Sequence, residues 1–238
     1  MLPSAPPLAP TVAELGSPLR DALQQLHAWS LRAVQLSASG PAGLRPREMT
    51  ESEQRDVGAT LRRLELRCAG IDLWIPPEHF VNSATVDRAV DAVDACCQFA
   101  SRVSCGSISL SLPDDGLAGE VIEAMASSSA KRGVVLAVLR SLDAGVPEGM
   151  VSCVDPAASL SQGGDPVMAA ADAAAAVRLS DLASGARIAP GQSGGRLDVA
   201  AYRAACSVGG SDRPVVADLR WMTDPVAALS LIRQAWGR

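Results

Sequence analysis

Short β-rich runs alternate along this chain with longer segments of helical period, and this rhythm constrains the fold most. Extended runs are predicted at residues 11–15, 33–37, 71–75, 107–112, 134–139, 151–155, 177–181 and 215–219. Strands that alternate with helices favour an α/β fold built on a parallel sheet. Eight such units in 238 residues suit a (β/α)8 TIM barrel, which typically needs about 250 residues, better than an open doubly wound sheet. We expect one barrel domain over residues 1–238, with residues 1–10 a loose N-terminal segment.

One repeat unit is incomplete. Between residues 139 and 151 only the segment RSLDAGVPEGM is present, which is too short and too rich in Gly and Pro for a crossover helix. The sequence therefore predicts a barrel in which helix 5 is shortened or missing. The barrel wall exposed at this gap needs an apolar cover, and we expect a second copy of the chain to provide it. The protein would then be a homo-oligomer.

Two helix starts are marked by an aspartate followed by a proline, at Asp165-Pro166 and Asp224-Pro225. The aspartate side chain can accept a hydrogen bond from the first free amides of a helix, and proline at the first helical position loses no bond. We expect both aspartates to be N-caps.

Composition excludes several classes of protein. Hydrophobic residues make up 48% of the chain, which excludes an extended disordered chain, and the net charge of −5 argues against a nucleic-acid binder with a basic face. No apolar run is long enough to cross a membrane, and the N-terminus has no signal-peptide pattern. The six cysteines form no CxxC pair. Buried, reduced thiols are therefore expected, in a cytoplasmic protein without a nucleic-acid or membrane partner.

In a barrel, reactive groups lie at the carboxyl ends of the strands and in the loops that follow. No nucleotide-binding, nucleophile-elbow or zinc-protease motif occurs in the chain. The glycine-rich loop 190–195 follows the seventh strand, where it is either a weak phosphate-binding signal or a plain turn. The strand-end criterion selects Glu14, Trp74, His79, Asp114, Asp115, Arg140, Asp155, Arg178, Asp181, Asp218 and Arg220.

Several local phrases, taken in order, carry a resemblance to a known family. They are DLWIPPEHF at 72–80, DRA at 87–89, VDPA at 154–157, GDP at 164–166, VRLSD at 177–181, PGQSGGRLD at 190–198 and VVAD at 215–218. With these phrases the chain resembles the xylose isomerase-like TIM barrels grouped as sugar phosphate isomerases and epimerases. The likeness extends over nearly the whole chain and is strongest from about residue 70 onward.

The resemblance implies a divalent metal at the barrel mouth, held by carboxylates and imidazoles. Carried over by position, these ligands fall on Leu139, Asp155, a site near Ala158, Arg178 and Asp218. Only Asp155 and Asp218 carry carboxylates, so the ligand set is incomplete and no metal cofactor is expected. The Arg178 guanidinium stays charged at any accessible pH and would repel a cation, but it can pair with Asp155 or Asp218.

Two functions remain open. The first is a sugar isomerase or epimerase that moves a proton next to a carbonyl, with Asp155 and Asp218 as proton carriers and Arg178 as electrophile. The second is a non-catalytic barrel that binds a sugar, a polyol or a partner at its mouth. Ligand binding is assigned to Trp74, His79, Asp181, Gly194 and Arg196. For Trp74 packing is the alternative role, and for His79 the alternative is a loop position bonded to backbone or solvent.

Overall fold

The computed structural model describes residues 5–16, 18–40, 42–141, 143–171, 176–208 and 214–237. Within this part of the chain, eight parallel strands form one sheet, in the order β1-β10-β7-β6-β5-β4-β3-β2. Their bounds are β1 Leu8–Pro10, β2 Ala33–Ser37, β3 Arg67–Leu73, β4 Ser107–Ser111, β5 Val135–Leu139, β6 Val151–Val154, β7 Ala176–Leu179 and β10 Val215–Ala217.

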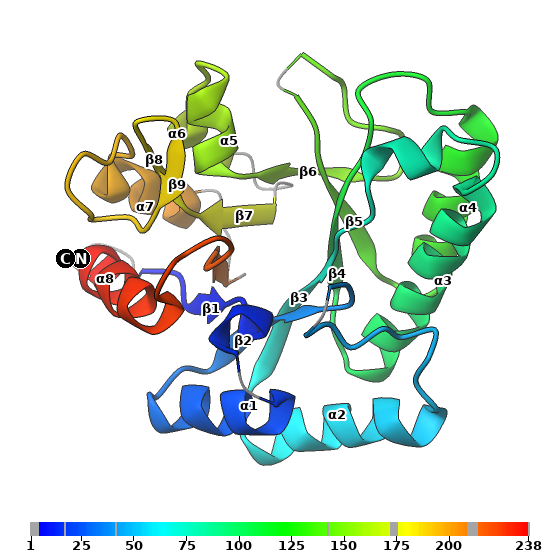
Figure 1. The fold of residues 1–238 in the computed structure, drawn as a ribbon, viewed down its shortest axis with the longest axis horizontal. Helices are drawn as coiled ribbons and strands as arrows, with labels where there is room; N and C mark the ends of the chain where they lie inside the picture. The colour runs from blue at the N-terminus through cyan, green and yellow to red at the C-terminus, as the bar shows by residue number, and fades with distance from the viewer. Residues whose placement is uncertain are drawn as a thin grey trace.

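The two end strands of this order, β1 and β2, meet through a parallel bridge between Thr11 and Gln35. The bridge closes the sheet into a ring, and the helices lie around the outside of that ring (Figure 1). The prediction of a (β/α)8 barrel is therefore confirmed. The helices are α1 Leu19–Ala28, α2 Glu51–Arg63, α3 Val86–Arg102, α4 Gly119–Ala130, α5 Pro156–Ser161, α6 Pro166–Ala170, α7 Val199–Val208 and α8 Pro225–Gly237.

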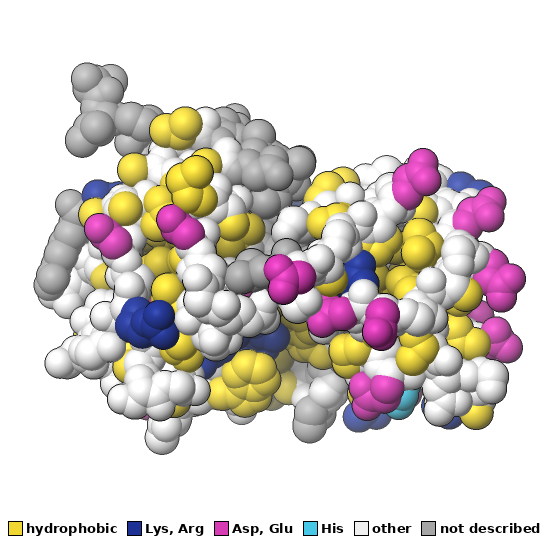
Figure 2. All heavy atoms as spheres, turned by 90° about the horizontal axis from the view of Figure 1, so that it is seen from above, with side chains coloured by type: hydrophobic (Ala, Val, Ile, Leu, Met, Phe, Trp, Pro, Cys, Tyr) yellow, Lys and Arg dark blue, Asp and Glu magenta, His cyan; other side chains and the backbone are white. Residues whose placement is uncertain are grey.

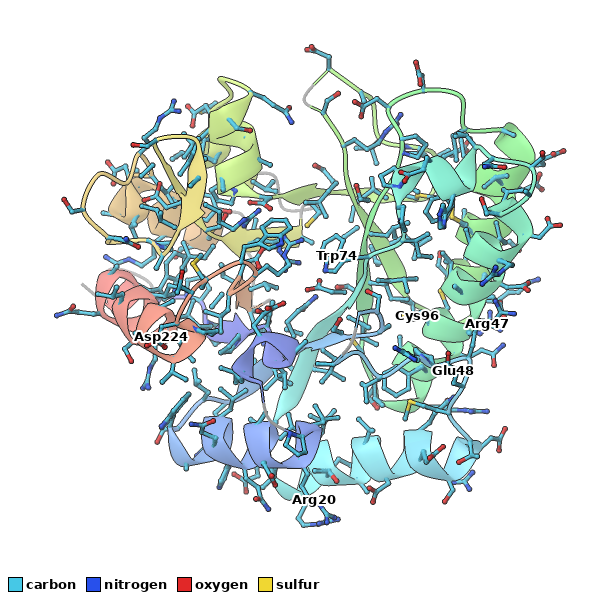
Figure 3. All side chains as sticks on the ribbon, viewed as in Figure 1. Arg20, Arg47, Glu48, Trp74, Cys96 and Asp224 are labelled. Carbon is cyan, nitrogen blue, oxygen red and sulfur yellow. The ribbon has the colours of Figure 1, made fainter. Side chains whose placement is uncertain are left out.

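The apolar core lies between the strands and the helices, whereas the inside of the barrel is polar. Successive side chains of a strand point to opposite faces of the sheet. In β3, Ile71 and Leu73 belong to the apolar core, while Asp72 between them is buried and bonded to Gln35 of β2. Cys96 lies on the side of α3 that faces the sheet (Figure 3). This alternation places polar groups along the barrel axis.

The first strand is not where the sequence predicted it. Residues 8–10 form β1, and residues 12–15 form a 3₁₀ helix that ends at Gly16, whose φ is +67°. The ladder with β10 uses the carbonyl of Pro7 and the amide of Thr11, so the amide that Pro10 lacks would point away from β10. The proline-rich start can therefore enter the barrel, and the expectation of a loose segment is wrong for residues 8–10. Residues 1–4 lie outside the described residues.

The ring of helices is interrupted between β5 and β6. Among the residues described there, 140–141 and 143–150, none is helical, and Figure 1 shows a loop between α4 and α5. The predicted loss of helix 5 is confirmed. Val138 of β5 and Val154 of β6 are nonetheless buried, since α4 packs against β5 and α6 against β6. A covering second copy of the chain stays a prediction.

Both predicted N-caps are present. Asp165 accepts hydrogen bonds from the amides of Val167 at 2.9 Å and Met168 at 3.3 Å. Asp224 accepts one from the amide of Ala227 at 2.9 Å, and its side chain lies at the start of α8 (Figure 3).

Removing either cap should destabilise the protein modestly. We expect Asp165→Ala and Asp224→Ala each to lower the free energy of unfolding by about 0.5–2 kcal/mol, because each leaves helix-end amides without an acceptor. Urea unfolding at pH 7 measures this. An unchanged midpoint in either variant would contradict the capping role.

The cysteines and the helices bear on the protein's surroundings. All six cysteines are buried and free, and burial raises the pKa of Cys97 to about 11 and of Cys153 to about 12. The thiols of Cys97 and Cys153 are therefore protonated at neutral pH. In the described part of the chain, no helix combines the length and the apolar character needed to cross a membrane. Figure 2 shows acidic side chains gathered on the side that α3 and α4 occupy.

Candidate functional site

The carboxyl ends of β3, β7 and β10 bring three charged side chains together inside the barrel. Arg178 of β7 donates to both carboxylate oxygens of Asp72, at 2.8 and 3.0 Å, and its Nε donates to Asp218 at 2.9 Å. The side chain of Arg178 is only 1% exposed. A buried guanidinium needs paired carboxylates, and two strands supply one each.

Two more guanidiniums lie on the mouth side of these three side chains. Arg187 bridges the carboxylates of Asp155 and Asp218, with an Nη1 to Asp218 distance of 3.1 Å. Arg220 bonds both oxygens of Asp218, its Nε at 2.9 and 3.0 Å, and reaches Asp155 at 3.3 Å. Three arginines and three aspartates thus form one cluster, in which every carboxylate is bonded to at least one guanidinium. We call these six residues the Arg–Asp cluster.

Neutral groups fix the ends of the cluster. The Ser180 hydroxyl donates a hydrogen bond to Asp155 at 2.7 Å and accepts one from the amide of Ala157 at 3.1 Å. Gln35 donates to Asp72 at 2.7 Å. The hydroxyl of Tyr202 donates to the carbonyl of Arg178 at 2.7 Å. The acids are thereby held in place without bound ligand.

The electrostatics keep the carboxylates ionised. Burial alone would raise the pKa of Asp218, but the nearby guanidiniums of Arg178, Arg220 and Arg187 outweigh burial and hold that pKa well below its usual range. At Asp155, burial alone would also raise the pKa, but the positive charge of Arg187 outweighs burial, and the pKa is lowered. Carboxylates with lowered pKa values accept protons poorly at neutral pH.

Glu14 behaves in the opposite way. Burial raises its pKa above the ordinary value, and the negative charges of Asp218 and Asp72 raise it further, although Arg220 acts against them. Glu14 follows β1 and lies at the edge of the mouth beside the Arg–Asp cluster. It is the carboxyl there that takes up a proton more readily than an ordinary glutamate.

Two tryptophans frame the cluster. The Arg220 guanidinium lies 4.3 Å from the ring centre of Trp74 and 5.2 Å from that of Trp221. Arg187 also lies 5.2 Å from the Trp221 ring. Trp74 extends into the middle of the ring of strands (Figure 3), whereas Trp221 is 76% exposed and has a φ of +62°. A bulky residue held at positive φ is strained, and such strain is common at ligand clamps.

The mouth contains two cavities separated by these aromatic and guanidinium groups. The larger, of about 780 Å³, is lined on one side by Arg140, Asp155 and Arg187. The smaller, of about 490 Å³, is lined by Glu14, Asp72 and several Ser and Thr side chains. Trp74, Arg220 and Trp221 line both. The larger cavity falls within the range that small-molecule ligands occupy.

A hairpin that follows β7 brings Arg187 into the mouth. Strands β8 (Asp181–Ala183) and β9 (Ala186–Ile188) pair in an antiparallel ladder. Their two-residue turn has positive φ at Ser184, 50°, and at Gly185, 79°. That combination is the type I′ turn, whose twist matches a hairpin. The hairpin turns the chain back, so that Arg187 faces the cluster.

The structure brings together some of the predicted site residues. Asp155, Asp218 and Arg178 lie in the Arg–Asp cluster and Trp74 lies against it. The expected pairing of Arg178 with Asp218 is present, but the partner of Asp155 is not Arg178: Arg187 and Arg220 bind Asp155 instead.

The other predicted ligand-binding residues lie elsewhere. His79 sits in a 3₁₀ turn, Pro77–Phe80, and does not line either mouth cavity. Gly194 and Arg196 are exposed in the loop after β9. Asp181 is buried and accepts the amides of Arg196 and Leu197 at 2.9 and 2.8 Å. The carboxylate of Asp181 thus holds the segment just after the glycine-rich loop, and residues 190–194 of that loop form turns.

Sequence reasoning missed Asp72, Arg187 and Trp221 as site residues. Asp72 opens a phrase used in the resemblance, and its position between apolar residues of a strand marks it as inward-facing. Trp221 directly follows Arg220, which the strand-end criterion selected. Arg187 gives no such signal, because it depends on a hairpin that lies outside the repeating strand–helix unit.

The donor set does not fit the divalent metal that the resemblance implies. Leu139 and Ala158 have no ligand atoms, and the Arg178 guanidinium lies between Asp72 and Asp218. Both Asp155 and Asp218 are bonded to arginines that would have to move before a cation could bind. In the part of the chain that the structure describes, no three His, Cys, Asp or Glu side chains are grouped to hold a metal ion.

Comparison with known proteins identifies the fold. No family model and no curated sequence matches the chain. A xylose isomerase domain protein from Planctomyces limnophilus matches with a TM-score of 0.73 at 18% identity, over 98% of this chain and 95% of that one. An L-ribulose 3-epimerase matches at 0.68 and 12%, over 97% and 93%. An IolI protein with a bound zinc atom matches at 0.69 and 11%, over 96% of each chain. The predicted xylose isomerase-like fold is confirmed.

Proposed function

We propose that this xylose isomerase-like barrel binds a small sugar or polyol in the 780 Å³ cavity and does so without a metal. The observation that carries the proposal is the place of Arg178, paired with Asp72 and Asp218. A permanent internal cation there supplies the positive charge that a metal would supply in a related barrel. The structural neighbours that are sugar epimerases support a sugar-like ligand.

The cavity has the groups that sugar binding needs. Indole faces pack against the C–H faces of sugar rings, and Trp74 and Trp221 both line the cavity. Arg187 and Arg220 keep 10% and 11% of their side-chain surface exposed, and a guanidinium has five N–H donors. Donors that do not bond Asp155 or Asp218 are free to bond ligand hydroxyls at the cavity floor.

The same geometry favours binding over isomerisation. A proton carrier needs a pKa near the working pH, and the pKa values of Asp155 and Asp218 are both lowered. Arg178 is too buried to polarise a carbonyl in the cavity. Since neither aspartate that the resemblance points to suits proton transfer, we propose that the barrel binds its ligand without isomerising it. The six free thiols support a reducing compartment such as the cytoplasm.

Calorimetric titration with D-glucose, D-fructose, D-xylose and myo-inositol tests the proposal. We expect one-to-one binding of at least one of these compounds, with the same affinity in EDTA and in added Mn²⁺, and no conversion of the bound sugar. Trp221→Ala should weaken binding about tenfold, because it removes a stacking face. Met168→Ala, an equally exposed apolar truncation outside the cavity, is the control.

The opposite results are as clear. Binding that disappears in EDTA would reject the metal-free site, and turnover of the sugar would support the isomerase instead. The absence of binding by any compound in the series would reject the sugar-like ligand.

A further inference from the structure

One arginine of the mouth forms no ion pair within the described part of the chain. Arg140 directly follows β5, where the helix between β5 and β6 is absent, and it lines the 780 Å³ cavity. The other three mouth arginines, Arg178, Arg187 and Arg220, each bond aspartates of the cluster. Among the described residues no carboxylate lies within 4 Å of the Arg140 guanidinium.

Backbone carbonyls hold Arg140 instead. Its Nη1 donates to the carbonyl of Gly145 and its Nη2 to the carbonyl of Asp114. Its Nε is shielded from solvent, and no described residue supplies an acceptor for it. The Asp114 carboxylate is close enough for Arg140 to contribute to its lowered pKa, but the largest cause of that lowering is the amide of Ser141, which Asp114 accepts at 2.9 Å. Neutral carbonyls therefore orient the guanidinium, and among the described residues it forms no ion pair, although the Asp114 carboxylate lies in the same cavity lining.

We infer that the ligand of the large cavity carries an anionic group, a carboxylate or a phosphate, and that Arg140 binds it. The inference rests on the proposed function and names the class of ligand: a sugar acid or a sugar phosphate. Arg140 and the two tryptophans line the same cavity, so one ligand can place its anion on Arg140 and its ring against the indoles. A fixed guanidinium suits this role, because charge-assisted bonds to carboxylate and phosphate are stronger than neutral ones.

The experiment compares neutral and anionic forms of one sugar. D-glucose, D-glucuronate, D-glucose 6-phosphate and inorganic phosphate are titrated by calorimetry into the wild type, Arg140→Gln and Arg140→Lys. We expect at least one anionic sugar to bind more tightly than D-glucose, and to bind more weakly as salt is raised. Arg140→Gln should lower that affinity about tenfold or more, a clearly larger loss than for D-glucose, and Arg140→Lys should restore part of it.

Arg45→Gln is the control, because Arg45 is exposed and pairs with Glu48 on the surface. Far-ultraviolet circular dichroism shows whether each variant is folded. If Arg140→Gln does not fold, the salt dependence in the wild type and the Arg140→Lys titration decide. Preference for D-glucuronate identifies a carboxylate, and preference for D-glucose 6-phosphate, with competition by inorganic phosphate, identifies a phosphate.

Two results would overturn the inference. Equal affinity for D-glucose and its anionic forms would reject the anion site while leaving the proposed sugar binding intact. An anionic sugar that binds Arg140→Gln as well as the wild type would reject Arg140 as its anchor. Failure of all four compounds, together with the neutral series above, would reject both proposals.

Discussion

Asp218→Asn is expected to lower the free energy of unfolding by about 3–5 kcal/mol, the range typical for removing one partner of a buried ion pair. Asp218 is fully buried and accepts hydrogen bonds from Arg178, Arg187 and Arg220. Asparagine keeps the size of the side chain but removes the charge. Three guanidiniums would then share the two carboxylates that remain.

Urea unfolding at pH 7 measures this change. Asp115→Asn is a matched control, because it makes the same chemical change at an exposed position in the loop after β4, and it should stay within about 0.5 kcal/mol of the wild type. A loss below about 1 kcal/mol in Asp218→Asn would show that this carboxylate does not hold the cluster together.

The second large effect concerns acid. The pKa values of Asp218 and Asp155 are lower in the folded state than in the unfolded chain, where the pKa of an aspartate is about 3.9. Their contribution to stability is therefore complete above about pH 4, and it is lost progressively as the pH falls from there toward the folded-state pKa. We expect the urea midpoint to fall steeply below about pH 4.

Glu14 has the opposite sign. Its pKa is raised in the folded state, so its ionised form opposes folding at neutral pH, and protonation relieves this as the pH falls through the raised value. We expect the urea midpoint to rise slightly as the pH falls from 7 to about 5, before the acid loss.

Unfolding curves at pH 7, 5.5, 4.5 and 3.5 test both signs. Glu14→Gln should remove the small rise, and Asp218→Asn should remove most of the steep loss. An acid profile of Asp218→Asn that parallels the wild type would refute the assignment.

The repeating pattern was enough to predict the barrel but not its first strand. Seven predicted strands overlap observed ones, because alternating apolar residues have to face the helices wherever the strand lies. The first strand was misplaced because a proline has no amide hydrogen to donate and therefore looks unsuitable for a sheet. Only the pairing with β10 shows that no bond to β10 is needed from Pro10. The loss of helix 5 was predictable, since eleven residues rich in Gly and Pro cannot form a crossover helix.

The candidate site was predictable only in part. Asp155, Arg178 and Asp218 could be identified because they stand at strand ends, where a barrel collects its reactive groups. The pairing of Asp72 with Arg178 joins residues 106 positions apart in the chain. It can be seen only once β3 and β7 face each other across the barrel. Arg187 requires the β8–β9 hairpin, whose path depends on a two-residue turn.

The sequence by itself determined the strand–helix order and the missing helix, because these follow from local pattern. The absence of metal-ligating side chains at residues 139, 158 and 178 had a meaning only through the family resemblance, which implies a metal there. Only the tertiary structure decided which charges neutralise one another. Ion pairing depends on distances of a few ångströms between side chains far apart in sequence, and strand closure sets those distances. That is why Arg178, Arg187 and Arg220 form a closed cluster with three aspartates, while Arg140 at the mouth forms no ion pair with any described residue.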